Sequence, residues 1–289
     1  MNKQLQRWAR LFLWPTLAAF SIGFVWPFCR GLYLSFCRFV TVSDARWVGL
    51  DNYVAALRDE GFLYSFLLTL AFALVSVAVI NLCAFVIARV LTQKIPGRNV
   101  FRTVFFSPNL IGGIVLGYIW QLIINGILAR FDTALALEAK FGFWGLVVLT
   151  AWQQIGYMMI IYIAGLQSVP DSLYEAARMD GASGRQILFR ITIPMVMPAI
   201  TICTFLTLTG SFKLFDQNLA LTGGAPGRLT AEGGTLYLTE LLALNIYNTF
   251  YSTGAARGVG QAKAVLFSAL VALIALAQLR WTRDREVQQ

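Results

Sequence analysis

The chain has 289 residues, of which 58% are hydrophobic and only 13% are charged, and its mean hydropathy is +0.67. This composition is too apolar for a soluble domain of this length, so it predicts a protein of the lipid bilayer. The formal net charge is +9, and the sequence contains no histidine. The lack of histidine excludes a His-based catalytic triad and a zinc site with imidazole ligands.

Six apolar segments are long enough to cross a membrane. A hydrocarbon core of about 30 Å needs about 20 largely apolar residues in a helix. The segments that qualify are about 11–36, 62–90, 103–124, 143–166, 191–214 and 258–279. The sequence therefore predicts an all-α, polytopic membrane protein with six transmembrane helices in a single domain over residues 1–289. An even number of spans places both termini on one side.

The first apolar segment has one feature of a secretory signal peptide, because three basic residues precede it (Lys3, Arg7 and Arg10). However, it contains two Trp-Pro pairs, at 14–15 and 26–27, and no small-x-small cleavage site follows. We therefore expect a membrane span here.

The basic residues orient these spans. The side that holds the termini has 13 of the 23 Lys and Arg residues, against 10 on the other side. The thirteen are Lys3, Arg7, Arg10, Arg89, Lys94, Arg98, Arg102, Arg178, Arg185, Arg190, Arg280, Arg283 and Arg285. Because cytoplasmic loops carry the excess of Lys and Arg, both termini are predicted to be cytoplasmic. The positive charge then reflects topology and does not indicate nucleic-acid binding.

Few other residues near the spans suggest chemistry. Four cysteines without Cys-x-x-Cys spacing are predicted to be packing residues and not metal ligands: Cys29, Cys37, Cys83 and Cys203. Four ionisable residues lie near predicted helix ends, where a long side chain can reach the interface: Arg89, Lys213, Asp216 and Lys263. None forms a proton relay at the centre of the membrane.

A polar segment, EAARMDGASGRQILFRITIP at 175–194, lies between two apolar spans. Pro170 stops the preceding span, and Asp171 or Ser172 is predicted to cap a short helix over 173–179. The Asp-Gly pair at 180–181 breaks this helix, because glycine adopts a positive φ at low cost. A second, amphipathic stretch is predicted to begin near Ser183, with its apolar face formed by Ile187, Leu188 and Ile191.

Two segments on the other side of the membrane have recognisable patterns. The stretch WVGLDNYVAAL (47–57) precedes the second span. The stretch FDQNLALTGGAPG (215–227) contains glycines and a proline that require a tight turn. Apolar and aromatic residues at helical spacing over 236–251 then predict an amphipathic helix near the outer membrane face.

The polar segment resembles the EAA loop of permease subunits in ATP-binding-cassette (ABC) importers. The carbohydrate-uptake branch reads EAA, three residues, GA, then a phenylalanine and an I-x-x-P ending. The matching residues here are Glu175, Ala176, Ala177, Gly181, Ala182, Phe189, Ile191 and Pro194. The 47–57 segment and the LTGG-x-P element resemble segments of the same branch. The alternative is a polar surface loop that contains a helix break.

The resemblance implies a type I ABC importer permease fold in the bacterial cytoplasmic (inner) membrane. It also implies three kinds of partner: a second homologous permease, two ATPase subunits that use ATP and Mg²⁺, and an extracytoplasmic solute-binding protein. The loop at about 170–194 would couple to the ATPase through Glu175, Ala176, Ala177, Asp180, Gly181 and Ala182. The outer loop at about 217–255 would contribute to a vestibule that the binding protein meets.

The chain is not expected to be an enzyme or to bind a cofactor itself. It has no G-x-x-x-x-G-K-[ST] phosphate loop, so ATP hydrolysis is expected from the partner subunit. The alternative function is an ion-coupled secondary transporter. Such a protein would be expected to place ionisable residues at mid-membrane and often to show inverted repeats, neither of which we find.

A sugar needs amide and hydroxyl groups for its hydroxyls and aromatic faces for its C–H surfaces. Residues of these types inside the spans are Gln121, Asn125, Trp152, Gln153, Gln154, Tyr157 and Ser211. The alternative for each is hydrogen bonding between helices or an interfacial aromatic belt. Glycines 112, 113 and 117 predict close helix packing. The solute stays open between a sugar, glycerol-phosphate and another polyol.

Overall fold

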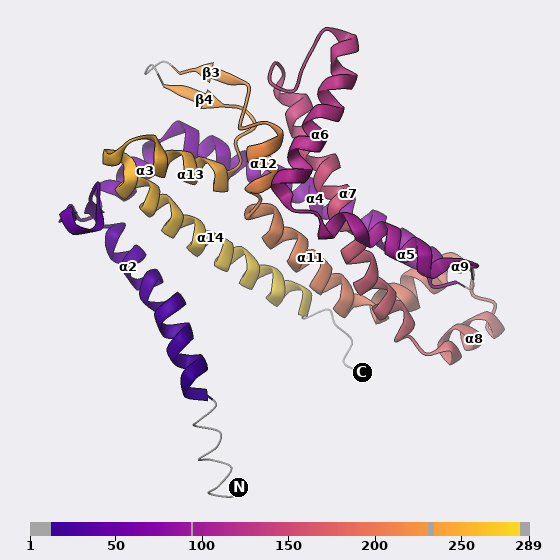
Figure 1. The fold of residues 1–289 in the computed structure, drawn as a ribbon. Helices are drawn as coiled ribbons and strands as arrows, with labels where there is room; N and C mark the ends of the chain where they lie inside the picture. Colours follow the sequence, from indigo (N-terminus) through magenta and orange to yellow (C-terminus); the bar gives the residue numbers. More distant parts are fainter. Residues whose placement is uncertain (1–12, 94, 231–233, 284–289) are drawn as a thin grey trace, which may run out of the picture. The chain divides into compact units, whose positions relative to one another are not determined.

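The computed structural model describes residues 13–93, 95–230 and 234–283, and this part of the chain is mostly helical (Figure 1). It forms two compact units, one from residues up to 62 together with 246–268, and one from 63–245 together with the segment from 269. The single-domain assignment stays a prediction. Several residues used above to orient the chain lie outside the described residues: Lys3, Arg7, Arg10, Lys94 and Arg285. Residues 231–233 of the outer loop also lie outside them.

The first unit begins with the helical segment Leu13–Leu34, in which a π-helical turn, η1 (Ser21–Val25), leads into α2 (Trp26–Leu34). Strand β1 (Cys37–Arg38) pairs antiparallel with β2 (Arg46–Trp47) around η2 (Val42–Asp44), with Cys37 opposite Trp47. Helix α3 (Asp51–Arg58) follows. The unit also holds the start of α4 (Glu60–Leu91), part of α13 (Leu242–Ser252), η6 (Gly254–Ala256) and the start of α14 (Arg257–Arg283).

The small core of this unit is built on Leu34, Cys37 and Phe39, with Phe250 of α13 packed against it. The Asn52 side chain of α3 donates hydrogen bonds to the carbonyls of Ser35 and Cys37, both at 2.9 Å. These bonds satisfy backbone groups that the short strands leave buried.

The second unit contains most of α4 and the elements that follow it. In chain order these are α5 (Arg98–Phe106), η3 (Ser107–Leu110), α6 (Gly113–Leu128), η4 (Ala129–Phe131), α7 (Ala139–Gln167), α8 (Asp171–Met179), α9 (Gly184–Ile187), η5 (Leu188–Thr192), α10 (Ile193–Met195), α11 (Met197–Phe212), α12 (Asp216–Leu221), β3 (Gly227–Leu229) and β4 (Thr235–Tyr237). Strands β3 and β4 pair antiparallel.

Within the described residues, five helical segments are long and apolar enough to cross a membrane. They are Leu13–Leu34, Glu60–Leu91, Gly113–Phe131, Ala139–Gln167 and Gly254–Arg280. A bent pair, Gly184–Met195 and Met197–Phe212, gives a sixth span when it is counted as one. Six spans were predicted, so the number agrees on this count.

The predicted third span, 103–124, is wrong in its bounds. Residues 103–106 belong to α5, which ends before Pro108, and the span begins only at Gly113. Proline lacks the N–H that would continue a helix. The apolar run was misleading because α5 exposes Val100, Phe101 and Val104 along its length.

The predicted fifth span, 191–214, is not one straight helix. Its two halves meet at an angle of 68° beside Val196, which lies between Pro194 and Pro198. Two prolines so close together remove backbone donors from consecutive turns, and such a helix bends.

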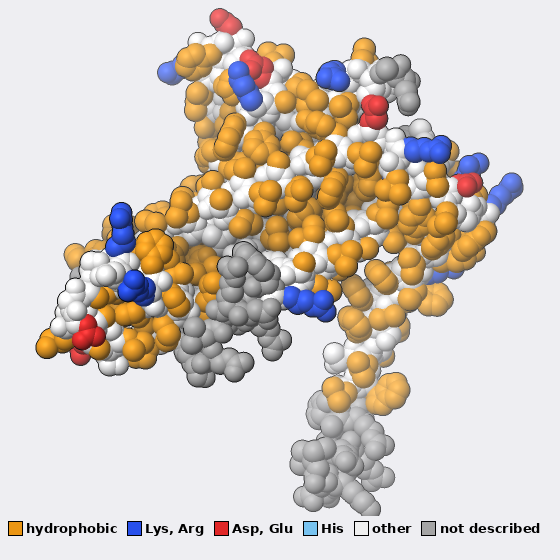
Figure 2. Space-filling model, turned by 180° about the vertical axis from the view of Figure 1, so that it is seen from behind, with side chains coloured by type: hydrophobic (Ala, Val, Ile, Leu, Met, Phe, Trp, Pro, Cys, Tyr) orange, Lys and Arg blue, Asp and Glu red, His pale blue; other side chains and the backbone are white. Residues whose placement is uncertain are grey.

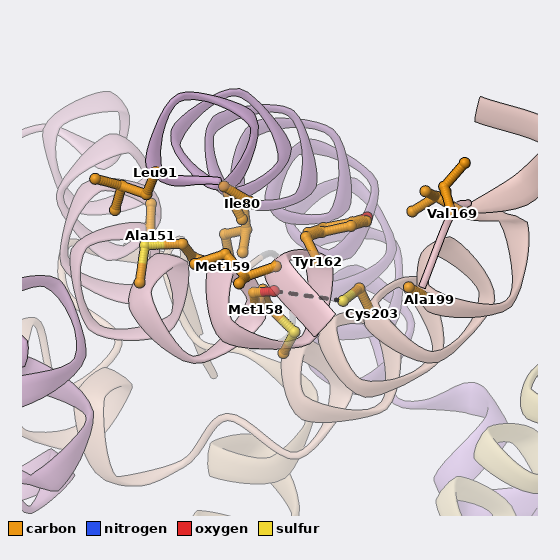
Figure 3. Close-up of a cluster of buried hydrophobic side chains, with 13 residues drawn as sticks. Ile80, Leu91, Ala151, Met158, Met159, Tyr162, Val169, Ala199 and Cys203 are labelled. Carbon is orange, nitrogen blue, oxygen red and sulfur yellow. Dashed lines mark hydrogen bonds between the residues drawn. The ribbon is translucent and has the colours of Figure 1, made fainter. Parts of the chain in front are cut away.

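Two clusters of buried side chains hold the second unit together. In the first, α4, α7 and α11 meet through side chains that include Ile80, Met159 and Cys203 (Figure 3). The Cys203 thiol lies 3.7 Å from the carbonyl oxygen of Met158. In the second cluster, Leu221 of α12 packs with residues of α4, α6 and α7.

The cysteine and glycine predictions are confirmed in part. Cys37 and Cys203 are buried, whereas Cys29 is exposed and Cys83 is half-buried.

A Cβ at Gly113 would lie 2.8 Å from Cβ of Asp216, and one at Gly117 would lie 2.5 Å from Cβ of Ala220, so both glycines allow α12 to approach α6. At Gly112 a Cβ would meet nothing within 4 Å, and the packing prediction is wrong there.

Exposed apolar side chains follow the long helices. On α4, for example, Leu67, Leu74 and Leu82 are all exposed. Hydrophobic side chains cover much of the face drawn in Figure 2, and charged side chains appear on it only in scattered places. Helices of this length with apolar outer faces suit a hydrocarbon environment.

Candidate coupling site and translocation path

The EAA segment folds as two short helices around a tight turn. Helix α8 ends at Met179, Asp180 is its C-cap residue, and Gly181 follows with φ of +74°. The Ala182 N–H donates to the Ala177 carbonyl at 2.9 Å, and the Gly181 N–H donates to the Arg178 carbonyl at 3.1 Å. This is the Schellman pattern of a helix end, which needs a residue with positive φ. The predicted break at 180–181 is confirmed.

The start of the next helix is fixed by Ser183. Its hydroxyl accepts from the Gln186 N–H at 3.4 Å, while the Gln186 side chain accepts from the Ser183 N–H at 2.7 Å. This reciprocal pair is a capping box. The predicted cap of α8, by contrast, is wrong, because Pro170 is the N-cap residue and no side chain caps it. Asp171 lies in the first turn, where its charge interacts favourably with the helix dipole.

The predicted apolar face of the second stretch lies on α9 and η5 and is only partly buried. Ile187, Leu188 and Ile191 are all half-buried. The Thr192 hydroxyl lies 3.5 Å from that of Tyr174 in α8, so the two halves of the EAA segment contact each other. The segment is therefore held at both ends and at its turn.

The six predicted coupling residues differ in exposure. Ala177 is buried and Ala182 is half-buried, whereas Glu175, Ala176, Asp180 and Gly181 are exposed. The Glu175 carboxylate has no hydrogen-bond or ion-pair partner in the described part of the chain. The neighbouring Met179 is 88% exposed. An unpaired carboxylate beside an exposed apolar side chain suits a surface that another protein covers.

Two hollows border this segment. A cleft of about 710 Å³ lies between α8, the C-terminal turn of α4 and the end of α7, with Arg89, Gln167 and Arg178 in its walls. A smaller hollow of about 270 Å³ is lined by residues that include Asp180, Gly181 and Arg190. The turn of the EAA segment therefore stands between two concave surfaces.

Three of the predicted substrate residues make contacts that hold the bundle together. The Gln121 amide donates to the Leu221 carbonyl at 3.0 Å. The Asn125 side chain accepts from the Leu135 N–H at 2.9 Å. Gln153 is buried, and its amide donates to the Ile111 carbonyl at 3.0 Å. These three residues therefore form hydrogen bonds within the bundle, which was the alternative to sugar binding.

The other four predicted residues have different surroundings. Gln154 and Ser211 line one cavity of about 60 Å³, together with Thr150 and Thr207. Trp152 is exposed on α7, and its ring packs edge-on against Trp120 with centroids 5.7 Å apart. Tyr157 is also exposed on α7. Of the seven residues, Gln154 and Ser211 lie together in this cavity.

Sequence reasoning missed the polar residues of α12. Gln217 and Asn218 are buried, and Gln217 donates to the Gln153 side chain at 2.7 Å. Sequence reasoning also missed Asn109, which is half-buried and whose amide donates to the Gln154 side chain at 3.3 Å. The signal in the sequence is the Gln-Asn pair within 214–221, whereas our prediction for 215–227 concerned only the tight turn at its glycines and proline.

One ionisable residue contradicts the prediction made for it. Arg89, Lys213 and Asp216 are exposed, but the Lys263 side chain is completely buried. Lys263 forms an ion pair with Asp59, donates to the Thr249 hydroxyl at 2.7 Å, and lies 5.3 Å from the ring centre of Phe62. It does not extend to the interface, because it faces the α3–α4 junction of the first unit.

Comparison with known proteins decides the family. Residues 96–283 match the family described as binding-protein-dependent transport system inner membrane component. The chain belongs to this family. It is 39% identical to a probable starch degradation products transport system permease protein of Thermoanaerobacterium thermosulfurigenes, over 97% of this chain and 96% of that protein. It is 29% identical to a trehalose/maltose transport system permease protein of Thermococcus litoralis, over 95% and 93%.

A solved structure agrees on the fold. A bacterial alginate ABC transporter, in complex with its pentasaccharide-bound periplasmic protein, contains a chain that matches with a TM-score of 0.78. The match covers 98% of this chain and 96% of that chain at 19% sequence identity. At that identity the likeness supports the fold alone.

These findings confirm the main sequence predictions. The chain has the fold of type I ABC importer permeases and is an inner-membrane permease subunit of such an importer. It is a transport subunit and not an enzyme, and the ATPase of these systems is a separate subunit. The placement of the termini stays a prediction.

Proposed function

We propose that this chain forms half of the translocation path for a saccharide in a binding-protein-dependent ABC importer. The supporting observation is its 39% identity, over nearly the whole chain, to a permease named for starch degradation products. Glycerol-phosphate is the second candidate, because sn-glycerol-3-phosphate permeases such as that of Brucella abortus are 28% identical over 94% of this chain.

Identification of the solute is best done with the binding protein that accompanies this permease. A ligand that binds only the folded protein raises its melting temperature. We expect maltodextrin-type oligosaccharides to raise it and sn-glycerol-3-phosphate to leave it unchanged. A shift with glycerol phosphate alone would contradict the saccharide assignment and support the second candidate.

The proposed assembly has a second homologous permease, two ATPase subunits that use ATP and Mg²⁺, and an external solute-binding protein. This chain would bind no cofactor of its own. The EAA segment would dock on the ATPase, with Glu175 meeting a basic residue there, the exposed Ala176 permitting close approach, and Gly181 setting the angle of the turn. Ala177, which was also predicted to permit close approach, is buried against the chain itself. The Schellman turn at the end of α8 and the capping box at the start of α9 support this role, because their bonds fix the turn that follows the exposed Glu175.

Glu175→Lys tests this docking. The substitution puts a cation opposite the proposed basic partner, so the chain should reach the membrane but lose ATPase binding or coupled uptake. Glu138→Lys is the control for a charge reversal elsewhere, since the Glu138 side chain is 45% exposed, pairs with Lys140 and lies between α6 and α7, far from the EAA segment in sequence. Normal uptake by the Glu175→Lys importer would contradict the coupling role.

We further propose that the chain lies in a bacterial cytoplasmic membrane with both termini in the cytoplasm. Single cysteines placed at exposed positions within 217–250, such as Leu229 and Tyr237, should react with an impermeant maleimide added to intact cells, whereas cysteines at 171–185 should not. Replacing the exposed Cys29 by serine removes the main background site. Labelling within 171–185 in intact cells would reverse the orientation.

A further inference from the structure

Helix α12 is held between α6, α7 and the part of the outer loop that carries the β3–β4 hairpin (222–241), all within the second unit. Its close approach to α6 depends on Gly113 and Gly117, as described above. Its adjacent residues Gln217 and Asn218 are both buried and make hydrogen bonds in different directions. Successive residues of an α-helix point about 100° apart, so one short helix can serve two neighbours.

Gln217 connects α12 to the membrane helices. Its Nε2 donates to Oε1 of Gln153 at 2.7 Å, and Nε2 of Gln153 donates to the Ile111 carbonyl at 3.0 Å. Gln153 lies on α7 between Trp152 and Gln154, two of the candidate path residues. Any shift of Gln217 therefore acts on the part of α7 that carries these residues.

Asn218 connects the same helix to the outer loop. It is completely buried, and its Nδ2 donates to the Thr239 carbonyl at 2.8 Å and to the Thr222 hydroxyl at 3.1 Å. Its Oδ1 accepts from the Leu241 N–H at 2.9 Å. The Thr239 hydroxyl in turn donates to the Ala225 carbonyl at 2.7 Å. Asn218 therefore holds both sides of the loop that carries the β3–β4 hairpin.

Amides suit this task better than apolar side chains would. Burial of an amide is unfavourable unless its donors and acceptors are paired, and here Asn218 has partners for both its nitrogen and its oxygen. Such directional bonds permit one arrangement of the loop against α12, whereas an apolar contact permits several.

We propose that Gln217 and Asn218 are positioning residues that transmit the position of the outer loop to α7. This inference rests on the proposed function, in which the loaded binding protein contacts the outer loop. Docking that moves the loop would pull on Asn218, and α12 would carry the displacement through Gln217 to Gln153. The segment thereby links recognition of the binding protein to the translocation path.

The test uses the complete importer in liposomes with its ATPase and binding protein. The variants are Gln217→Met and Asn218→Ser, and Leu219→Met on the same helix is the control. We expect the stimulation of ATPase activity by the loaded binding protein to fall about fivefold or more in both amide variants, the lower range of a typical coupling between sites. Basal ATPase activity, and the binding-protein concentration for half-maximal stimulation, should stay close to wild type.

Two results would overturn the inference. Stimulation equal to wild type in the amide variants would show that the contacts transmit nothing. A fall of basal activity in the same proportion as stimulated activity would show a purely structural role. If Asn218→Ser fails to assemble, Gln217→Met alone decides the test. This variant removes the donor to Oε1 of Gln153, but Gln153 keeps its bond to the Ile111 carbonyl, and no buried N–H loses its acceptor.

The wild-type importer separates this inference from the proposed function. Stimulation of its ATPase by the loaded binding protein must be observed before the variants are compared. If the wild type shows none with any saccharide, the proposed function itself is contradicted, and this inference with it.

Discussion

Lys263 and Asp59 form an ion pair whose two side chains differ in burial, so we predict that removing either partner costs a different amount of stability. The Lys263 side chain is 0% exposed, whereas that of Asp59 is 39% exposed. Breaking a buried pair costs about 3–5 kcal/mol when the remaining charge stays buried. Asp59→Asn leaves the buried ammonium without this carboxylate, so we expect a loss of about 3 kcal/mol. Lys263→Met leaves a carboxylate that water reaches, so we expect about 1–2 kcal/mol.

The asparagine variant isolates the charge. Oδ1 of Asp59 accepts from the Gly61 N–H at 2.9 Å, and an asparagine side chain preserves this cap of α4. Thermal unfolding of the purified importer, followed by tryptophan fluorescence, should give the lower midpoint for Asp59→Asn. The control is Lys140→Gln, which removes an exposed pair with Glu138 and should cost less than about 1 kcal/mol. A lower midpoint for Lys263→Met than for Asp59→Asn would refute this account.

Two further predictions concern glycines. Gly156→Val should abolish accumulation of the folded chain, because a Cβ at this position would overlap the backbone of Phe105. The control, Gly210→Ala, should be tolerated, since nothing lies within 4 Å of its Cβ position. Immunodetection of the chain in membranes compares the two variants. Gly181→Val should lower coupled uptake, because a left-handed conformation costs a β-branched residue about 1–2 kcal/mol or more. Gly184→Ala, also in open space, is its control, and equal uptake by both variants would contradict the prediction.

The EAA segment could be predicted from sequence because its geometry is local. A glycine after Asp180 and a serine before Gln186 determine a helix end and a helix start through bonds that span only a few residues. The cap of α8 was missed by the same local reasoning, since Pro170 takes the position that Asp171 or Ser172 was expected to fill.

The bounds of the membrane helices depended on more than hydropathy. The apolar residues of α5 extend the third apolar run toward the N-terminus, and the average over the run does not detect the break near Pro108. The 68° bend near Val196 likewise lies within an apolar run. A hydropathy window measures composition, whereas proline position decides where a helix stops.

The translocation path could be predicted only as a set of residue types. Gln121 and Gln153 have the chemistry to bind a sugar, but both form hydrogen bonds with backbone carbonyls of neighbouring segments. Spacing along one helix does not reveal which neighbour occupies its polar face. Lys263 was misjudged for the same reason, because its partner Asp59 is about 200 residues away in sequence.

Reconstitution tests the central claim most directly. The chain lacks a phosphate loop and histidine, and it belongs to a family whose ATPase is a separate subunit. Alone in liposomes, it should neither hydrolyse ATP nor accumulate saccharide against a gradient. Addition of the second permease, the ATPase and the loaded binding protein should produce both activities. Concentrative uptake by the lone chain, driven by a proton or sodium gradient, would contradict the account and support a secondary transporter.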